Sequence, residues 1–161
     1  MKKKVMMLLA ALTMTAASYA QFQEGKPYAA ASLSGLNLNY ATGEKWNLDL
    51  GAKVGFFALD NIMVTGQLEY RYQDDGPNSF SIGPGIRYYI EQNGIYLGAG
   101  ANFVHRSSSY NDFMPGIQLG YAYFLNRILT IEPEIYYNQS LKNHDQYSGF
   151  GFRVGIGIYL E

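Results

Sequence analysis

The chain has 161 residues, no cysteine and a formal net charge of −1. This length fits one domain, and the lack of cysteine excludes disulfides, thiolate metal sites and a lipidated cysteine. Only 16% of the residues are charged, and a further 16% are aromatic. The absence of a basic excess argues against a nucleic-acid-binding protein.

The first twenty residues have the pattern of an export signal. Three lysines at positions 2–4 precede a short apolar run at positions 5–17, and Ser18-Tyr19-Ala20 supplies small residues where a signal peptidase cuts. The apolar run is too short for a transmembrane helix. We therefore expect a cleaved signal peptide over residues 1–20 and a single domain over residues 21–161.

In eight later segments, large apolar residues alternate with polar or small ones. A period of two is typical of strands whose two faces meet different surroundings, and each segment is long enough to cross a bilayer when tilted. No segment shows the 3.6-residue period of a helix. The segments are residues 28–40, 45–57, 62–73, 79–90, 95–105, 112–124, 128–139 and 147–161.

Some positions interrupt this pattern. The first segment changes parity near Ser34-Gly35, where we expect a β-bulge. Pro84, Pro115 and Pro133 fall inside segments, although proline cannot donate a ladder hydrogen bond. We expect bulges or local irregularity at these prolines.

The connections between segments alternate in length. Those at residues 59–61, 91–94 and 125–127 are tight turns, and the other four are on the whole longer and more polar. Membrane-spanning barrels have short periplasmic turns and longer external loops. Aromatic residues near both ends of most segments, such as Trp46 and Phe56, would form two interfacial belts.

The last segment shows the alternation best. One face carries only large apolar residues, which are Phe150, Phe152, Val154, Ile156, Ile158 and Leu160. The other face is mostly glycine, with one cation, and it consists of Gly149, Gly151, Arg153, Gly155, Gly157 and Tyr159. Glycine on the concave side of a narrow barrel leaves room for neighbouring side chains. We therefore predict an all-β fold, an eight-stranded antiparallel up-and-down transmembrane barrel with apolar residues outside and polar residues inside.

With this pattern the chain resembles the small eight-stranded outer-membrane barrels, the OmpX-like proteins and the transmembrane domain of OmpA, often grouped as porin-family proteins. The resemblance covers residues 21–161. The assembly signal of that family, a polar residue, a glycine and two alternate hydrophobic residues, matches Arg153, Gly155, Ile158 and Leu160. The chain departs from the signal because it ends in Leu160-Glu161 and not in an aromatic residue.

The resemblance implies an exported protein of a Gram-negative outer membrane, without enzymatic activity. The implied role is in envelope structure or surface interaction. As partners we expect outer-membrane lipid, lipopolysaccharide and the barrel-assembly machinery, with no nucleic acid. We expect a monomer that needs no cofactor or metal.

The predicted inner faces carry four acids and four bases. An eight-stranded barrel has an interior only just wide enough for side chains to fill, so buried charges must be paired or hydrated. We favour a polar core that fills the lumen over an open pore, and we expect the glutamates to face Arg or Lys; a narrow channel for small solutes is the alternative. The predicted interior residues are Asp49, Lys53, Glu69, Arg71, Arg87, Glu132, Glu134 and Arg153.

Two further alternatives remain. His105 and Ser107 share a strand face and resemble the His-x-Ser pair of the lipid A deacylase barrel, but a catalytic serine also needs an acid that orients the base. Asp112 is the only acid between Glu91 and Glu132, and the sixth segment has no glutamate. We therefore predict no catalytic residues. A soluble lipocalin-like barrel would have the opposite facing, with an apolar lumen and a charged exterior.

Overall fold

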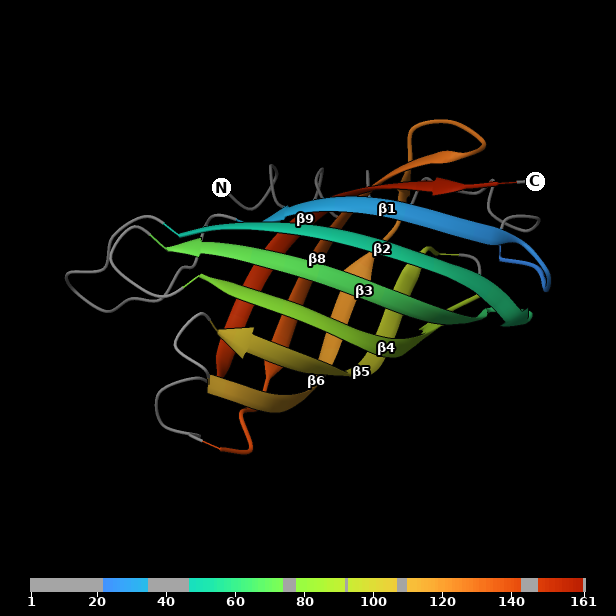
Figure 1. Ribbon diagram of the computed structural model, residues 1–161. Coiled ribbons are helices and arrows are strands. Elements are labelled where there is room, and N and C mark those ends of the chain that lie inside the picture. Colours follow the sequence, from blue (N-terminus) through green and yellow to red (C-terminus); the bar gives the residue numbers. More distant parts are fainter. Residues whose placement is uncertain are drawn as a thin grey trace, which may run out of the picture.

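The described residues of the computed structural model are 22–34, 47–73, 78–91, 93–106, 110–142 and 148–160. They form antiparallel strands that curve into one barrel (Figure 1). The strands are β1 (Pro27–Ser34), β2 (Asn47–Leu59), β3 (Ile62–Gln73), β4 (Ser79–Tyr89), β5 (Ile95–Arg106), β6 (Tyr110–Tyr121), β7 (Tyr123–Phe124), β8 (Leu129–Asn138) and β9 (Gly149–Tyr159). Among these residues, no helix has the length and apolar character that crossing a membrane would need.

The sheet closes on itself. Its order is β6-β5-β4-β3-β2-β1-β9-β8-β7, and β6 also pairs with β8. β6 and β7 follow one another across Ala122 and pair with the same strand in one register, so they act as a single barrel strand. The predicted eight-stranded antiparallel up-and-down barrel is thus confirmed.

The break at Ala122 differs from the continuous sixth segment that the sequence predicts. The Ala122 N–H donates to the carbonyl oxygen of Gly94 at 2.8 Å, in the turn between β4 and β5. This bond continues the β5–β6 pairing in register, since Ile95 is paired with Tyr121, so the interruption lies on the side that faces β8. Pro133 of β8 falls within the same interruption, and proline has no N–H to donate to a ladder.

The other prolines are accommodated without a bulge. The ladder between β4 and β5 is interrupted at Gly83 and Pro84 and resumes in the same register. Pro115 lies one residue before the paired stretch of β6 and β8, and its carbonyl oxygen accepts a bond from the N–H of Gln139 at 2.8 Å. Local irregularity is therefore enough. The bulge expected near Ser34-Gly35 extends outside the described residues, as does the rest of the first predicted segment.

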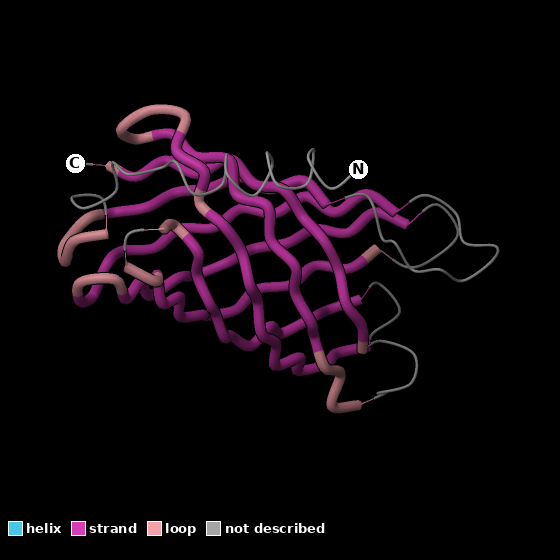
Figure 2. The backbone as a smooth tube through the Cα atoms, turned by 180° about the vertical axis from the view of Figure 1, so that it is seen from behind, coloured by secondary structure: helices cyan, strands magenta, loops and turns pink. Residues whose placement is uncertain are grey.

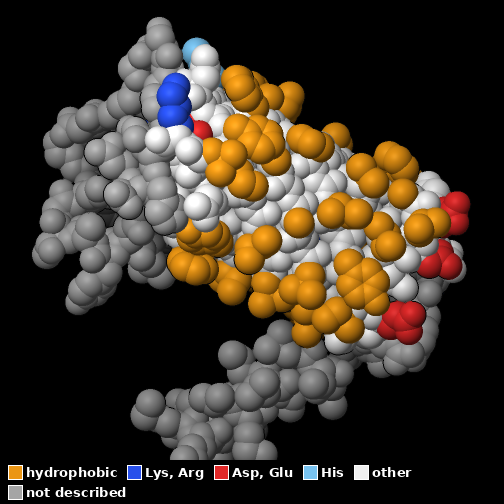
Figure 3. Space-filling model, turned by 90° about the horizontal axis from the view of Figure 1, so that it is seen from below, with side chains coloured by type: hydrophobic (Ala, Val, Ile, Leu, Met, Phe, Trp, Pro, Cys, Tyr) orange, Lys and Arg blue, Asp and Glu red, His pale blue; other side chains and the backbone are white. Residues whose placement is uncertain are grey.

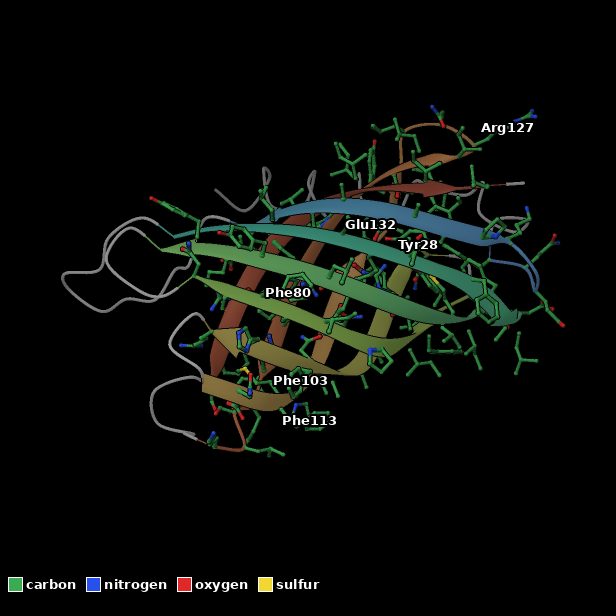
Figure 4. The ribbon with its side chains drawn as sticks, in the orientation of Figure 1. Tyr28, Phe80, Phe103, Phe113, Arg127 and Glu132 are labelled. Carbon is green, nitrogen blue, oxygen red and sulfur yellow. The ribbon has the colours of Figure 1, made fainter. Side chains whose placement is uncertain are left out.

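The two faces of the barrel differ as the alternation predicts. Large apolar side chains cover the outer surface (Figure 3). In Figure 4, Phe80, Phe103 and Phe113 point outward, whereas Tyr28 and Glu132 lie inside. Neighbouring strands agree in register: Val54 of β2 is opposite Ala29 of β1, both on the outer face.

The two ends of the barrel are also different (Figure 2). The turns β2–β3, β4–β5 and β7–β8 lie at one end, here called the short-turn end. Asn61 and Gly94 adopt φ angles of 62° and 72° in two of these turns, a left-handed conformation that Asn and Gly tolerate best. The other four connections join the strands at the opposite end, here called the loop end, and parts of them lie outside the described residues.

Two glycines offer a matched test of how closely the neighbouring strands pack. A Cβ at Gly83 would lie 1.9 Å from the carbonyl oxygen of Ala101, whereas a Cβ at Gly66 would meet only a Val54 methyl at 4.0 Å. We expect Gly83→Ala to lower the free energy of unfolding by about 1–3 kcal/mol through overpacking. Gly66→Ala is expected to leave it unchanged or raise it by about 0.5–1 kcal/mol. Urea unfolding of both variants measures this, and equal midpoints would contradict it.

Candidate functional site

A network of buried ion pairs crosses the middle of the barrel, centred on Glu134 of β8. Its Oε2 accepts hydrogen bonds from Arg87 Nη2 and from the Tyr96 hydroxyl, each at 2.8 Å. Its Oε1 accepts a bond from Arg153 Nε at 2.5 Å, and Lys53 Nζ lies 3.6 Å from Oε2. One carboxylate thus contacts side chains from β2, β4, β5 and β9. Since Glu134 is only 2% exposed, these partners replace the water it loses on burial.

Glu132 forms the second centre of the network. It lies two residues before Glu134 on β8, nearer the short-turn end. Its Oε2 accepts from Arg87 Nη1 at 2.9 Å and from the Tyr28 hydroxyl at 2.7 Å. Its Oε1 accepts from the hydroxyls of Thr130 and Tyr159, at 2.9 and 3.0 Å. Arg87 therefore bridges the two carboxylates of β8 from the opposite wall, where β4 lies.

The network continues toward the loop end through Arg153. This guanidinium pairs with Glu69 of β3 and donates to Gln118 of β6 at 3.2 Å. Its Cζ lies 4.7 Å from the centre of the Tyr136 ring, within range of a cation–π interaction. Arg71 then binds Asp49 through two parallel bonds of 2.7 and 2.9 Å.

All eight residues predicted for the interior lie on the inner faces of their strands. Six are buried and two, Glu69 and Arg71, are half-buried. Each takes part in at least one ion pair. Balanced charges of this kind stabilise one another in a medium where an unpaired charge would be strongly unfavourable.

Glycines make the space for this network. A Cβ at Gly120 would lie 2.3 Å from the Tyr96 hydroxyl, and a Cβ at Gly151 would lie 2.4 Å from the Tyr136 hydroxyl. Each tyrosine lies over a glycine of the adjacent strand, with Tyr96 opposite Gly120 and Tyr136 opposite Gly151. The glycine-rich inner face of the last strand therefore makes room for side chains of the neighbouring strands.

Two small cavities adjoin the network. One is lined by Lys53, Arg87, Tyr96 and both glutamates of β8, and the other by Arg153 and the amides of four Asn and Gln residues. Their volumes of about 10 and 20 Å³ hold roughly one water molecule each. Arg153 lines both cavities, and each is far smaller than a solute pathway would need.

The residues considered for catalysis are not arranged for it. His105 is exposed, and its Nδ1 lies 2.6 Å from the Asn111 side-chain oxygen. Asp112 is buried and accepts hydrogen bonds from the Ser140 hydroxyl and from the N–H of Phe113. Ser107 lies outside the described residues. No group of three metal-ligating side chains occurs among the residues that the structure describes.

The proposed assembly-signal residues occupy both faces of β9. Arg153 and Gly155 are buried on the inner face, and Ile158 and Leu160 are exposed on the outer face. Arg153 thus has a structural role of its own in the ion-pair network. Recognition by an assembly machinery remains a prediction.

The sequence pattern did not identify Phe22 as an interior residue. Phe22 precedes the first strand, shows no periodic pattern, and is nevertheless only 4% exposed. Its ring stacks on Tyr89 with centroids 4.3 Å apart, at the short-turn end. A large apolar residue between Gln21 and Gln23, just after the predicted cleavage site, was the only available signal.

Comparison with known proteins agrees on the fold. No family model and no curated protein matches the chain. The N-terminal β-barrel domain of OprF from Pseudomonas aeruginosa superposes with a TM-score of 0.64 at 14% identity, covering 85% of this chain and 98% of that one. Ail from Yersinia pestis superposes with a TM-score of 0.59 at 13% identity, covering 85% of this chain and 100% of that one. Neisserial surface protein A superposes with a TM-score of 0.52 at 15% identity, covering 84% of this chain and 94% of that one. The chain therefore has the fold of small outer-membrane barrels.

The central carboxylate can be tested by removing its charge. Glu134→Gln leaves Arg87, Arg153 and Lys53 with one buried anion fewer, and breaking a buried pair of this kind costs about 3–5 kcal/mol. We expect the free energy of unfolding to fall by about that amount, measured by urea denaturation. Glu91→Gln, at an exposed turn position, is the control and should change it by less than about 0.5 kcal/mol. Equal losses in both variants would contradict the central role of Glu134.

Proposed function

We propose that the protein is an integral outer-membrane barrel that contributes to envelope structure or to surface interaction, without an open pore. The observation that carries the proposal is the apolar outer surface. Among the described residues, thirty large hydrophobic side chains are exposed, from Ile131 at 36% to Phe150 at 79%. Soluble monomers rarely expose contiguous apolar patches of more than a few hundred Å², and hydrocarbon is the solvent that suits this surface.

The interior supports the same proposal. A soluble ligand-binding barrel would have an apolar lumen, whereas this lumen holds paired carboxylates, guanidinium groups and tyrosine hydroxyls. Charged side chains on the outside gather at the ends, and acidic ones lie at one end of the outer face in Figure 3. Such a distribution fits a barrel whose middle lies in hydrocarbon and whose ends meet water.

The names of the structural neighbours extend the proposal. OprF, Ail and Neisserial surface protein A come from bacteria, and the descriptions of the last two name an outer-membrane protein and a surface protein. By analogy we place this chain in the outer membrane of a Gram-negative bacterium, as a monomer exported by its signal peptide. Outer-membrane lipid, lipopolysaccharide and the assembly machinery are its proposed partners.

A catalytic role has less support. Among the described residues, His105 is paired with the Asn111 amide and not with an acid, and a histidine base needs an orienting group if it is to activate a nucleophile. Asp112, the nearest candidate acid, is held by Ser140. The geometry of the described residues therefore favours a structural or interaction role.

Charge substitutions on the outer face test the membrane placement. Val154 lies at the middle of β9 and Phe150 near its loop end, both exposed. In lipid vesicles we expect Val154→Arg to destabilise the barrel by about 2–4 kcal/mol and Phe150→Arg by about 0–1 kcal/mol, because the penalty depends on depth. Reversible guanidinium unfolding gives both values. Small and equal effects would indicate that water, not lipid, surrounds the barrel.

The filled lumen can be tested independently. Purified protein in planar bilayers should produce no resolved conductance steps, because ion pairs and tyrosines occupy the cross-section. A general porin in the same bilayers is the positive control. Reproducible steps from the unmodified protein would instead support the narrow-channel alternative.

A further inference from the structure

The segment before β1 turns back under the barrel and inserts an aromatic ring into the short-turn end. The Phe22 ring stacks on Tyr89 at 4.3 Å and lies 5.8–5.9 Å from the rings of Phe57, Phe124 and Tyr159. These neighbours come from four different strands: β2, β4, β7 and β9. Phe22 thus contacts the wall on several sides, as expected of a side chain that fills the end of a tube.

Backbone hydrogen bonds hold this segment in place. The Gly25 N–H donates to the carbonyl oxygen of Phe57, and the Asn61 N–H donates to that of Phe22, both at 2.8 Å. The Glu24 N–H donates to Asp60 Oδ1 at 2.9 Å. Gly25 has a φ of 84°, which suits the reversal in chain direction. The segment is therefore fixed mainly to the end of β2 and the β2–β3 turn.

Directly above this ring lies the ion-pair network. The Tyr89 and Tyr159 hydroxyls are 3.0 Å apart, and Arg87 Nη1 donates to Tyr89 at 3.3 Å. Tyr159 in turn donates to Glu132. One layer of aromatic side chains thus separates the buried charges from the short-turn end, and among the described residues Phe22 is its only member from outside the strands.

The segment also lies outside the strands of the sheet. Residues 22–26 precede β1 and belong to no strand, so their departure would break the hydrogen bonds to Phe57, Asp60 and Asn61 but no residue pair of the strand ladder. The barrel could remain closed while its end opened. A segment that takes no part in the strand ladder can open locally without global unfolding.

We propose that Phe22–Lys26 is a detachable stopper, which closes the short-turn end and controls the access of water and small solutes to the ion-pair network from that side. The barrel would then have one end sealed by its own chain. This proposal depends on the fold and not on membrane placement, so it can be tested in detergent micelles as well as in lipid.

The chain has no cysteine, so one introduced thiol can report access. Met63 is 0% exposed and belongs to the same buried cluster as Phe22. In micelles, Met63→Cys should react slowly with a small charged methanethiosulfonate reagent. Adding Phe22→Ala should raise the rate by about tenfold or more, because the seal is lost. Phe22→Leu keeps an apolar plug and should keep the rate low.

Two controls locate the effect. Phe56→Ala removes an exposed outer ring and should leave the Met63→Cys rate unchanged. Ser81→Cys is buried on the inner face of β4, nearer the loop end, and its rate should not respond to Phe22→Ala. Circular dichroism establishes that each variant is folded. The proposal is overturned if Met63→Cys reacts equally fast with and without Phe22, or if Ser81→Cys accelerates to the same extent, which would indicate general loosening.

Discussion

The contacts of one carboxylate, Glu134, determine how the interior is built. It accepts hydrogen bonds from Arg87, Arg153 and Tyr96 and lies near Lys53, so a single strand is tied to four others. A charge buried this deeply needs every one of these partners, since each unpaired group would be strongly unfavourable in a narrow interior. The cross-barrel distances that the network requires match a closed barrel of eight strands, so closure and charge pairing support each other.

The network and the outer surface depend on the same alternation. Because successive side chains of a strand point to opposite faces, each strand that contributes a charge inward contributes an apolar residue outward. On β8, Ile131 and Ile135 are exposed while Glu132 and Glu134 are buried. The barrel is therefore inverted relative to a soluble ligand-binding barrel, since its buried side is charged and its exposed side is apolar.

The fold was largely predictable because a period of two is a local property, and the third segment, 62–73, matches β3 in both bounds. The partners inside were not. Alternation indicates that Glu134 shares a face with Glu132, but the pairing of Arg87 with both depends on shear and closure, which involve residues distant in sequence. The break at Ala122 coincides with Pro133 on the facing strand, β8. Phe22 lies outside any periodic segment, so no pattern marked it.

The central claim is that hydrocarbon contacts the outside of this sheet while ionic groups fill its axis. The most direct measurement is the set of nuclear Overhauser contacts between lipid acyl chains and protein methyl groups in nanodiscs. We predict contacts from outer methyls such as those of Leu68, Ile82 and Ile156, and none from Met63, which is buried inside. Acyl contacts at Met63, or their absence at the three outer residues, would contradict the account.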